Sequence, residues 1–124
     1  MDKKILIVDD RTDTVDLVTF ALNKAGYITY SANTGPKALQ MLKKYDIDLV
    51  ILDIMMPGMS GKTVLEKIKK DKKLKKVKVI MLSAMRLEED EKKEFIKMGA
   101  DEFLSKPISI SILEKIVKKT LAKK

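Results

Sequence analysis

The chain has 124 residues, a length that fits one domain with a hydrophobic core of its own. It contains neither cysteine nor histidine, which excludes disulfides, thiolate and imidazole metal sites, and Ser-His catalysis. The net charge is +8, but only Arg11 and Arg86 are arginines, and the scattered lysines with few aromatic neighbours favour a solvated surface over a nucleic-acid interface.

Short apolar runs alternate with segments of helical periodicity along the whole chain. In chain order, the sequence predicts a strand at residues 5–8, a helix at 12–25, a strand at 27–31, a helix beginning near residue 36, a strand at 49–52, a helix at 61–70, a strand at 77–82, a helix at 88–98, a strand at 102–104 and a final helix from about residue 109. Five strands therefore alternate with five helices.

Individual residues mark the ends of these elements. Pro36 suits the first turn of a helix, and Gly99 is placed to end one. Either Ser109 or Ser111 is expected to cap the last helix, the latter in a capping box with Glu114. The lysine-rich segment 69–78 is expected to be a solvated helix end and loop.

The strand-forming runs indicate how the sheet is covered. Residues 49–52 are apolar at every position, which is typical of a parallel sheet with helices on both faces, whereas residues 27–31 are less apolar and suit an edge strand. The sequence therefore predicts an α/β fold with a doubly wound parallel sheet. Sheets of this kind bind ligands at the carboxyl ends of their strands.

Polar residues stand where the predicted strands stop. The first strand ends at Asp9 and Asp10, the third at Asp53 and the fourth at Ser83, and Lys106 follows the fifth. Three neighbouring carboxylates repel one another unless a cation lies between them, and oxygen ligands favour Mg²⁺, with Mn²⁺ as the alternative. Ser83 and Lys106 would suit phosphoryl oxygens.

Each of these residues also has a simpler interpretation. Asp10 could cap the first helix, Asp53 could open a turn, Ser83 could begin a loop and Lys106 could be a solvated lysine. Those interpretations must then hold jointly for five polar residues at one edge, which makes a common site the better explanation. No glycine-rich phosphate loop follows the first strand, so a dinucleotide-binding oxidoreductase is not expected.

Four motifs make the chain resemble the receiver domain of bacterial and archaeal response regulators. They are ILIVDD, LVILDIMMPGMSG, MLSA and SKP, in this order. The resemblance runs from Lys4 to Leu121. It implies a flavodoxin-like (βα)5 fold with strand order 2-1-3-4-5, and residues 1–124 as a single receiver domain of the chemotaxis type in two-component signalling.

The resemblance also implies a chemistry for the acidic residues. Asp53 would accept a phosphoryl group from a phosphohistidine on a sensor histidine kinase or histidine phosphotransfer protein. Mg²⁺ would be held by Asp10, Asp53 and the backbone carbonyl of Met55, with Asp9 acting through a water. Phosphoryl transfer depends mostly on positioning and charge neutralisation, which such a site supplies.

The remaining site residues would contact the phosphoryl group or move in response to it. By the same resemblance, Lys106 would pair with phosphoryl oxygens, and the bond between Lys106 and Pro107 would be cis. Ser83 would move toward the phosphoryl group and Phe103 would follow it inward. Phe103 lacks the phenol oxygen of the tyrosine that also occurs there, so its switching would depend on packing alone.

Methionines surround the expected site. Met55, Met56, Met59 and Met85 lie on loops beside it, and Met55 and Met85 stand two residues after Asp53 and Ser83. In the family, side chains at these two places flank the line of attack on the phosphoryl group. We expect Met55 and Met85 to shield the acyl phosphate from water and prolong its lifetime; loop packing is the alternative.

We expect the protein to signal by binding a downstream target protein. The binding surface would be the face formed by the fourth helix, fifth strand and fifth helix, and the protein would be a monomer or weak homodimer. No effector domain is expected after the last helix. No apolar run reaches the roughly 20 residues of a membrane span and the first residues form no signal peptide, so a cytoplasmic location is expected.

Two alternatives to this function stay open. The chain could be a receiver excised from a larger regulator or hybrid kinase, or a pseudo-receiver that only binds. An aspartyl phosphatase is disfavoured, because Met55 stands where its acid would be.

Overall fold

Strands and helices alternate strictly in the computed structural model, which describes residues 2–123. In chain order the elements are β1 (Lys4–Val8), α1 (Thr12–Lys24), β2 (Ile28–Ala32), α2 (Gly35–Lys44), β3 (Leu49–Asp53), α3 (Gly61–Lys70), β4 (Lys78–Ser83), α4 (Glu89–Lys97), β5 (Glu102–Ser105) and α5 (Ile110–Ala122). The predicted alternation is confirmed, and the bounds shift by only a residue or two from those predicted.

The five strands form one parallel sheet in the order β2-β1-β3-β4-β5. This order confirms the doubly wound, flavodoxin-like fold, and β2 is an edge strand as its weaker apolar character predicted. The register places Val8 opposite Leu52, and Asp53 opposite Leu82. The three central strands therefore end side by side, and the residues that follow them meet at one edge of the sheet.

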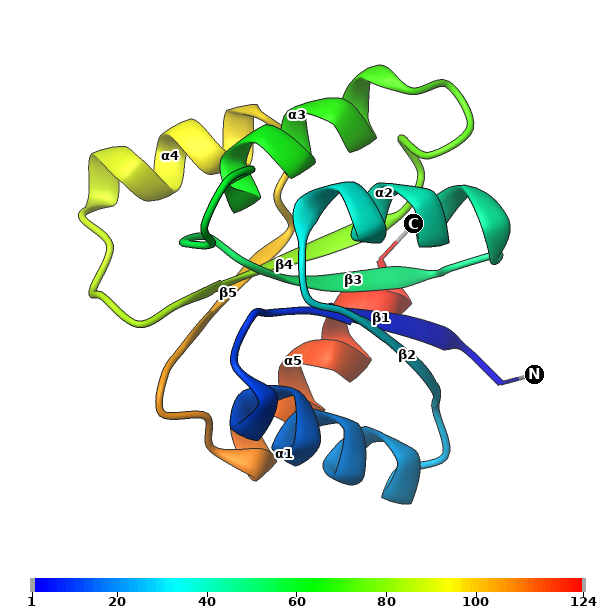
Figure 1. Cartoon of the computed structure of the whole chain (residues 1–124). Helices are drawn as coiled ribbons and strands as arrows, with labels where there is room; N and C mark the ends of the chain where they lie inside the picture. The colour runs from blue at the N-terminus through cyan, green and yellow to red at the C-terminus, as the bar shows by residue number, and fades with distance from the viewer. Residues whose placement is uncertain (1, 124) are drawn as a thin grey trace.

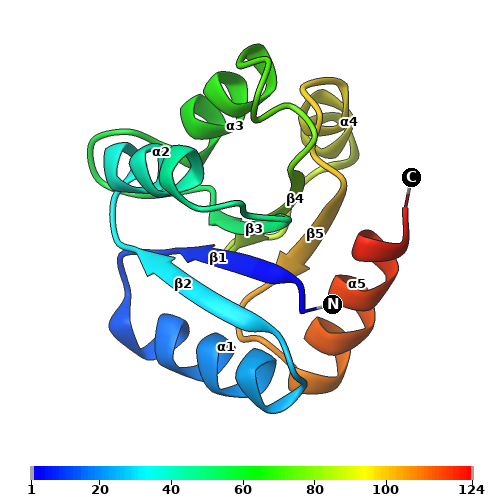
Figure 2. The same cartoon turned by 90° about the vertical axis from the view of Figure 1, so that its right-hand side faces the viewer.

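Helices cover both faces of the sheet. Helices α2, α3 and α4 lie on one face and α1 and α5 on the other (Figures 1 and 2). Because successive strand residues point to opposite faces, Val50 and Leu52 of β3 join the core under α2, α3 and α4, whereas Leu49 and Ile51 join the core over α1 and α5. All four side chains are fully buried, which explains why β3 is apolar at every position.

Side-chain hydrogen bonds cap the starts of α2, α3 and α4, the last through a capping box between Glu88 and Glu91. Thr34 Oγ1 accepts a hydrogen bond from the Lys37 amide at 3.2 Å before α2, and Ser60 Oγ accepts one from the Thr63 amide at 3.3 Å before α3. Of the two residues predicted as the cap of the last helix, Ser109 occupies the N-cap position, although it makes no side-chain cap bond. Helix α5 already begins at Ile110, so the alternative at Ser111, with its capping box to Glu114, is wrong.

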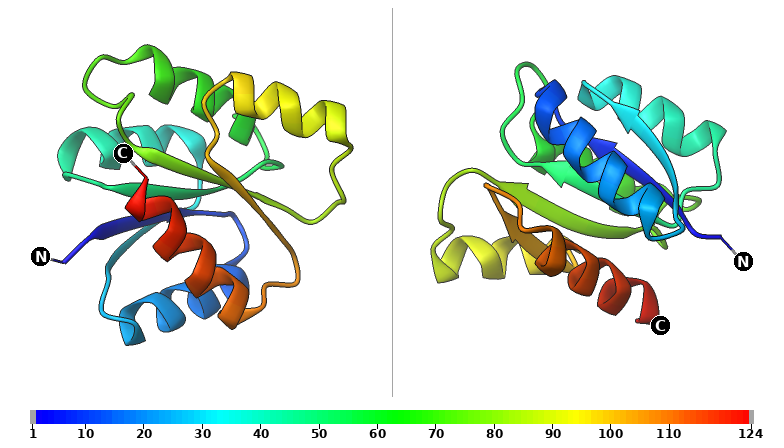
Figure 3. Two further views of the ribbon diagram at one scale, coloured as in Figure 1. Left: turned by 180° about the vertical axis from the view of Figure 1, so that it is seen from behind. Right: turned by 90° about the horizontal axis from the view of Figure 1, so that it is seen from below.

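The loops after β1, β3, β4 and β5 leave the sheet at the same end of the molecule (Figures 1 and 3). Helix α3 begins close under the end of β3, where the Gly61 amide donates to the Ile54 carbonyl at 2.9 Å. Among the helices of the described part of the chain, none is long and apolar enough to cross a lipid bilayer. The parallel topology thus brings the predicted site residues together.

Candidate functional site: a carboxylate cluster with a lysine

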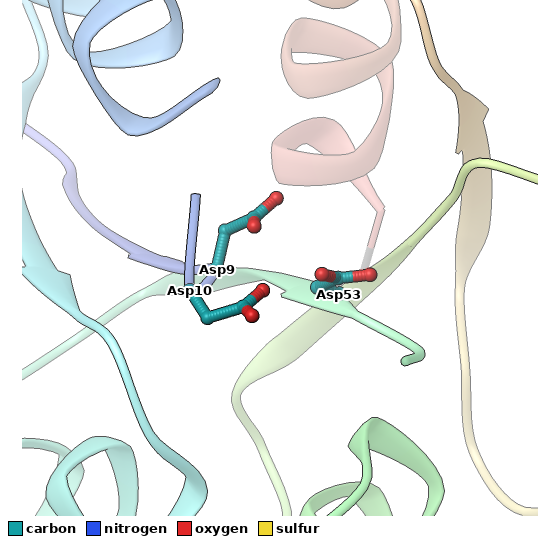
Figure 4. Close-up of side chains that lie close together, drawn as sticks. All are labelled: Asp9, Asp10 and Asp53. Atoms are coloured by element: carbon teal, nitrogen blue, oxygen red, sulfur yellow. The ribbon is translucent and has the colours of Figure 1, made fainter. Parts of the chain in front are cut away.

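Three carboxylates gather at the ends of β1 and β3. Asp9, Asp10 and Asp53 each offer an oxygen, and these oxygens lie within 4.8 Å of one another (Figure 4). Asp9 and Asp53 are 1% and 4% exposed, while Asp10 is exposed. Two buried acids and one exposed acid therefore face a common space that is open on the side of Asp10.

Backbone amides hold the two buried carboxylates in place. Asp9 Oδ1 accepts a hydrogen bond from the Arg11 amide at 2.9 Å, and Asp53 Oδ1 accepts one from the Met55 amide at 3.2 Å. Each bond runs from an amide two residues farther along the chain, where the strand has just ended. The turn after each strand therefore orients the carboxylate that precedes it.

Lys106 reaches both buried acids from the loop after β5. Its Nζ lies 2.9 Å from Asp9 Oδ2 and 3.6 Å from Asp53 Oδ2. Its backbone amide donates to the Ser83 carbonyl at 2.8 Å, which ties the loop to the end of β4. The peptide bond between Lys106 and Pro107 is cis. In this structure Lys106 thus lies closer to Asp9 than to Asp53.

The cluster raises the pKa of Asp53 to about 6. Burial is the main cause and the nearby Asp9 carboxylate adds to it, while Lys106 and the Met55 amide act in the opposite direction. Burial alone would lower the pKa of the Lys106 ammonium, but its contacts with Asp9 and Asp53 outweigh this and leave that pKa raised. The protein's own cation therefore offsets only part of the repulsion among the acids.

The donor set fits a hard divalent cation. Asp9 Oδ2 is buried and makes no well-aligned hydrogen bond, although the Lys106 ammonium is in ion-pair contact with it. Every side-chain donor in the cluster is a carboxylate oxygen, which is the ligand type that Mg²⁺ and Mn²⁺ prefer. Three carboxylates that share a single ammonium partner form an arrangement that a bound divalent cation would stabilise.

Ser83 and Phe103, the predicted switch residues, make different kinds of contact in the structure. The Ser83 hydroxyl donates to the Met85 carbonyl and accepts from the Met85 amide at 3.1 Å, so the loop after β4 occupies both its hydrogen-bonding functions. Phe103 is half-buried, and its ring packs edge-on against Phe95 of α4 with 6.3 Å between centroids. Ser83 is therefore held by its own loop, and Phe103 is in contact with α4.

The two methionines singled out in the sequence are exposed. Met55 is 69% exposed and Met85 66%, whereas Met56 is buried and Met59 half-buried. Met55 and Met85, here called the rim methionines, are therefore exposed side chains on the loops that follow Asp53 and Ser83. Met56 and Met59 pack against the core and are structural.

Gly61 is a residue that the sequence pattern marked only as a helix start. A Cβ added here would overlap the Asp53 carbonyl and the Ile54 Cα. Glycine therefore permits the first turn of α3 to approach the backbone that carries Asp53. The signal that could have revealed it is a glycine eight residues after a strand-ending aspartate, at the first position of a capped helix.

Known proteins share both the sequence and the fold. The model of a family described as the response regulator receiver domain matches residues 5–118. The regulatory protein VanR of Enterococcus faecium is 42% identical over 107 residues, which make up 86% of this chain and 45% of VanR. The chain therefore spans less than half the length of this relative.

Solved structures resemble the chain over almost its full length. The chemotaxis protein CheY4 of Vibrio cholerae superposes with a TM-score of 0.91 at 28% identity, covering 97% of this chain and 99% of its own. A CheY-like response regulator receiver domain protein of Methanospirillum hungatei JF-1 gives a TM-score of 0.88 at 30% identity, covering 98% of this chain and 94% of its own.

Proposed function

This chain belongs to the response regulator receiver domain family, whose members are phosphoryl-accepting signalling switches, and from that premise we propose that Asp53 is its phosphoryl acceptor. The observation that carries the proposal is the convergence of Asp9, Asp10 and Lys106 on Asp53 at the end of the central strand. Asp53 ends the central strand β3, and its carboxylate lies between the other two acids of the cluster and Lys106, whereas Asp9 is already paired with Lys106 at 2.9 Å.

The transfer makes one bond and breaks one. A carboxylate oxygen of Asp53 bonds to phosphorus while the bond from phosphorus to the donor's imidazole nitrogen breaks, and the imidazole leaves with that electron pair. The Met55 amide orients Asp53, and Lys106 is close enough to move from Asp9 toward the incoming phosphoryl oxygens. Hydrolysis of the acyl phosphate later restores the carboxylate. The chain thus acts as a switch and not as a turnover enzyme.

Asp9, Asp10 and Asp53 would hold Mg²⁺ or Mn²⁺, with the Met55 carbonyl as a further ligand. A bound divalent cation would supply positive charge to the phosphoryl oxygens in the transition state. The gathering of three carboxylates around one lysine and the raised pKa of Asp53 support this proposal, because both indicate negative charge that Lys106 alone does not offset.

The phosphate signal would pass through Ser83 and Phe103. To donate to a phosphoryl oxygen, the Ser83 hydroxyl must give up the bond that it donates to the Met85 carbonyl, which would loosen the loop between β4 and α4. Phe103 already touches Phe95, so its inward movement would change the packing under α4. The face that responds would be α4, β5 and α5. A coupling of this kind is typically worth about 1–3 kcal/mol.

The partners follow from the family and stay proposals for this chain. The donor would be a sensor histidine kinase or a histidine phosphotransfer protein, and the output a downstream target protein bound by a monomer or weak homodimer. Because the chain spans 45% of VanR, whether residues 1–124 act alone or as the receiver of a longer regulator is a separate question. A cytoplasmic location stays a prediction.

We further propose that Met55 and Met85 lengthen the life of the acyl phosphate. Both are exposed on the loops that follow Asp53 and Ser83, so their apolar side chains can fold over a phosphoryl group on Asp53 and exclude water from the line of attack. Neither side chain carries a group that would orient an attacking water.

Acetyl phosphate provides the test of the metal-assisted chemistry. The protein is incubated with acetyl phosphate and either Mg²⁺ or a chelator, and its intact mass is followed over time. We expect one phosphoryl group per chain with Mg²⁺ and little with the chelator. Equal incorporation under both conditions would show that the carboxylate cluster does not work through a divalent cation.

A further inference from the structure

A groove runs between α2 on one side and α3 with its following loop on the other. It consists of two hollows of about 830 and 670 Å³ that share Lys43, Asp71 and Leu74 as lining residues. The first extends toward Pro36 at the start of α2, and the second toward Tyr45 just past its end. The α2–α3 groove therefore follows the whole of α2, whose ten residues rise about 15 Å.

The floor of the α2–α3 groove is apolar. Leu42 and Leu74 are buried and shared with the core, and Leu39 and Met59 are half-buried side chains that line the groove. An occupant that places apolar side chains against Leu39 and Met59 would complete their burial. A ligand that carries only charge would leave this floor unused.

The rim of the groove is basic. Its lysines are all exposed and come from both walls: Lys37, Lys43, Lys44, Lys67, Lys72 and Lys73. In the described residues 2–123, none of these six lysines forms an ion pair with a carboxylate. The two acids on the rim are Asp46 and Asp71, and Asp71 Oδ1 is engaged by the Lys73 amide at 2.8 Å. The rim therefore carries excess positive charge.

Helix dipoles account for only part of this charge. Lys43, Lys44 and Lys67 lie in the last turns of α2 and α3, where cations are favourable. Lys37, in contrast, is in the first turn of α2, where a cation is unfavourable, and Lys72 and Lys73 lie in the loop beyond α3. The lysines of the rim thus gather along the groove and not simply at helix ends.

The wall beyond α3 is held in one conformation. The Lys69 ammonium donates to the carbonyls of Lys75 and Val77 at 3.0 and 2.9 Å, and Leu74 and Val77 are buried. The lysines of this loop therefore project from a fixed turn. A preformed site loses less conformational entropy on binding than a flexible loop would.

These features together identify the chemistry of the occupant. We propose that the α2–α3 groove binds an acidic amphipathic segment of a partner protein, with apolar side chains on the floor and carboxylates against the lysine rim. Nucleic acid fits less well, because the rim has no arginine and its Tyr45 ring is already stacked on Tyr30 at 4.4 Å. A lipid surface fits less well, because none of the large apolar residues that are exposed within residues 2–123 lies on the rim.

The proposed contact is separate from the phosphorylation site and its output face. Asp53 and Lys106 do not line the groove, and α4, β5 and α5 contribute no residue to it. Binding is therefore expected in both wild type and Asp53→Asn protein. This separates failure of the groove proposal from failure of the proposed phosphoryl chemistry.

A synthetic helical peptide tests the proposal directly. The probe is a labelled peptide of about 14 residues, long enough to cover α2, with leucines on one helical face and glutamates on the other. A peptide of the same composition in scrambled order is the control, and fluorescence anisotropy gives the affinities. We expect the amphipathic peptide to bind and the scrambled one to bind far more weakly. Equal affinities would overturn the proposal.

Two matched lysine variants locate the contact. The groove variant carries K43Q, K44Q, K72Q and K73Q, and the control variant carries K93Q, K97Q, K115Q and K118Q, exposed lysines outside the groove. The net charge changes equally in both. We expect the groove variant to lose on the order of tenfold in affinity and the control variant little. Equal losses would overturn the proposal, because binding would then follow net charge alone.

Competition tests the class of occupant. Duplex DNA and vesicles of anionic phospholipid are added as competitors at matched total charge, and Leu39→Gln reports on the floor. We expect weak competition by both and reduced peptide affinity for Leu39→Gln, whose circular dichroism confirms folding. Displacement of the peptide by either competitor at lower concentration than by unlabelled peptide, or full peptide affinity for Leu39→Gln, would overturn the assignment.

Discussion

Asp53 is a carboxylate in surroundings that disfavour its charge. It is 4% exposed and faces Asp9, and its pKa is raised from 3.8 to about 6. An acid with a raised folded-state pKa lowers stability as pH rises, because the unfolded chain ionises more readily. The cost is absent below about pH 4, grows between pH 4 and 6, and is fully present above pH 6. Function and stability are therefore opposed at this residue.

The first prediction concerns the stability of Asp53→Asn. Without divalent cations and above pH 6, we expect the variant to be more stable than wild type by about 1–3 kcal/mol, as measured by urea unfolding. The gain should vanish near pH 4. Saturating Mg²⁺ should stabilise wild type more than the variant. A variant that is less stable at pH 7 without cations would contradict this electrostatic account.

The second prediction concerns the rim methionines. Met85→Glu and Met55→Asn each place a polar group where an attacking water can be oriented, so we expect the phosphorylated protein to lose its phosphoryl group severalfold faster. The measurement is release of inorganic phosphate after acetyl phosphate is removed. Met56, which is buried, is no suitable control; Ile96→Asn, at an exposed apolar residue of α4, is. A wild-type half-life of seconds that neither substitution changes would exclude shielding.

Helix α3 owes its position to close contact with β3. The third prediction is that Gly61→Ala destabilises the protein by about 2 kcal/mol or more, because the added methyl group overlaps the Asp53 carbonyl. Phosphoryl uptake from acetyl phosphate should also slow, since Asp53 and the Ile54 backbone must shift. Lys62→Ala, one residue later and exposed, is the control and should change stability by less than about 1 kcal/mol. Normal stability of Gly61→Ala would mean that α3 moves freely.

The elements themselves could be predicted from sequence because their signals are local. The continuous apolar run of β3 and the helical periodicity of α3 each specify both type and place. The start of α5 could be predicted only to within two residues, because Ser109 and Ser111 are both suitable cap residues and the helix begins directly after Ser109. A local pattern does not decide between two neighbouring residues that can both act as caps.

The membership of the site could likewise be predicted, whereas its contacts could not. Parallel strands bring their carboxyl ends together whatever the side chains, so the positions of Asp9, Asp53 and Lys106 followed from topology. The preference of Lys106 for Asp9, and the bonds that hold Ser83 to Met85, depend on side-chain geometry that no spacing specifies. The α2–α3 groove could not be predicted from the sequence either, because it depends on how the side chains of α2, α3 and the following loop pack.

At the scale of the whole molecule, the sheet separates two surfaces with different chemistry. The carboxyl ends of the strands carry the carboxylate cluster (Figure 4). The helices on one face form a basic groove that follows α2. The fold and family membership establish a phosphoryl-accepting signalling switch. We propose that Asp53 accepts the phosphoryl group and that Met55 and Met85 lengthen the life of the acyl phosphate. We also propose that the α2–α3 groove is a second surface for binding a partner protein.

The most direct test of the central claim is intact-mass spectrometry of wild type and Asp53→Asn after incubation with acetyl phosphate or beryllofluoride in Mg²⁺. Circular dichroism of both proteins confirms that the substitution preserves the fold. The account predicts one adduct per chain on wild type and none on Asp53→Asn. An adduct of equal yield on Asp53→Asn would contradict it, because another residue would then be the acceptor.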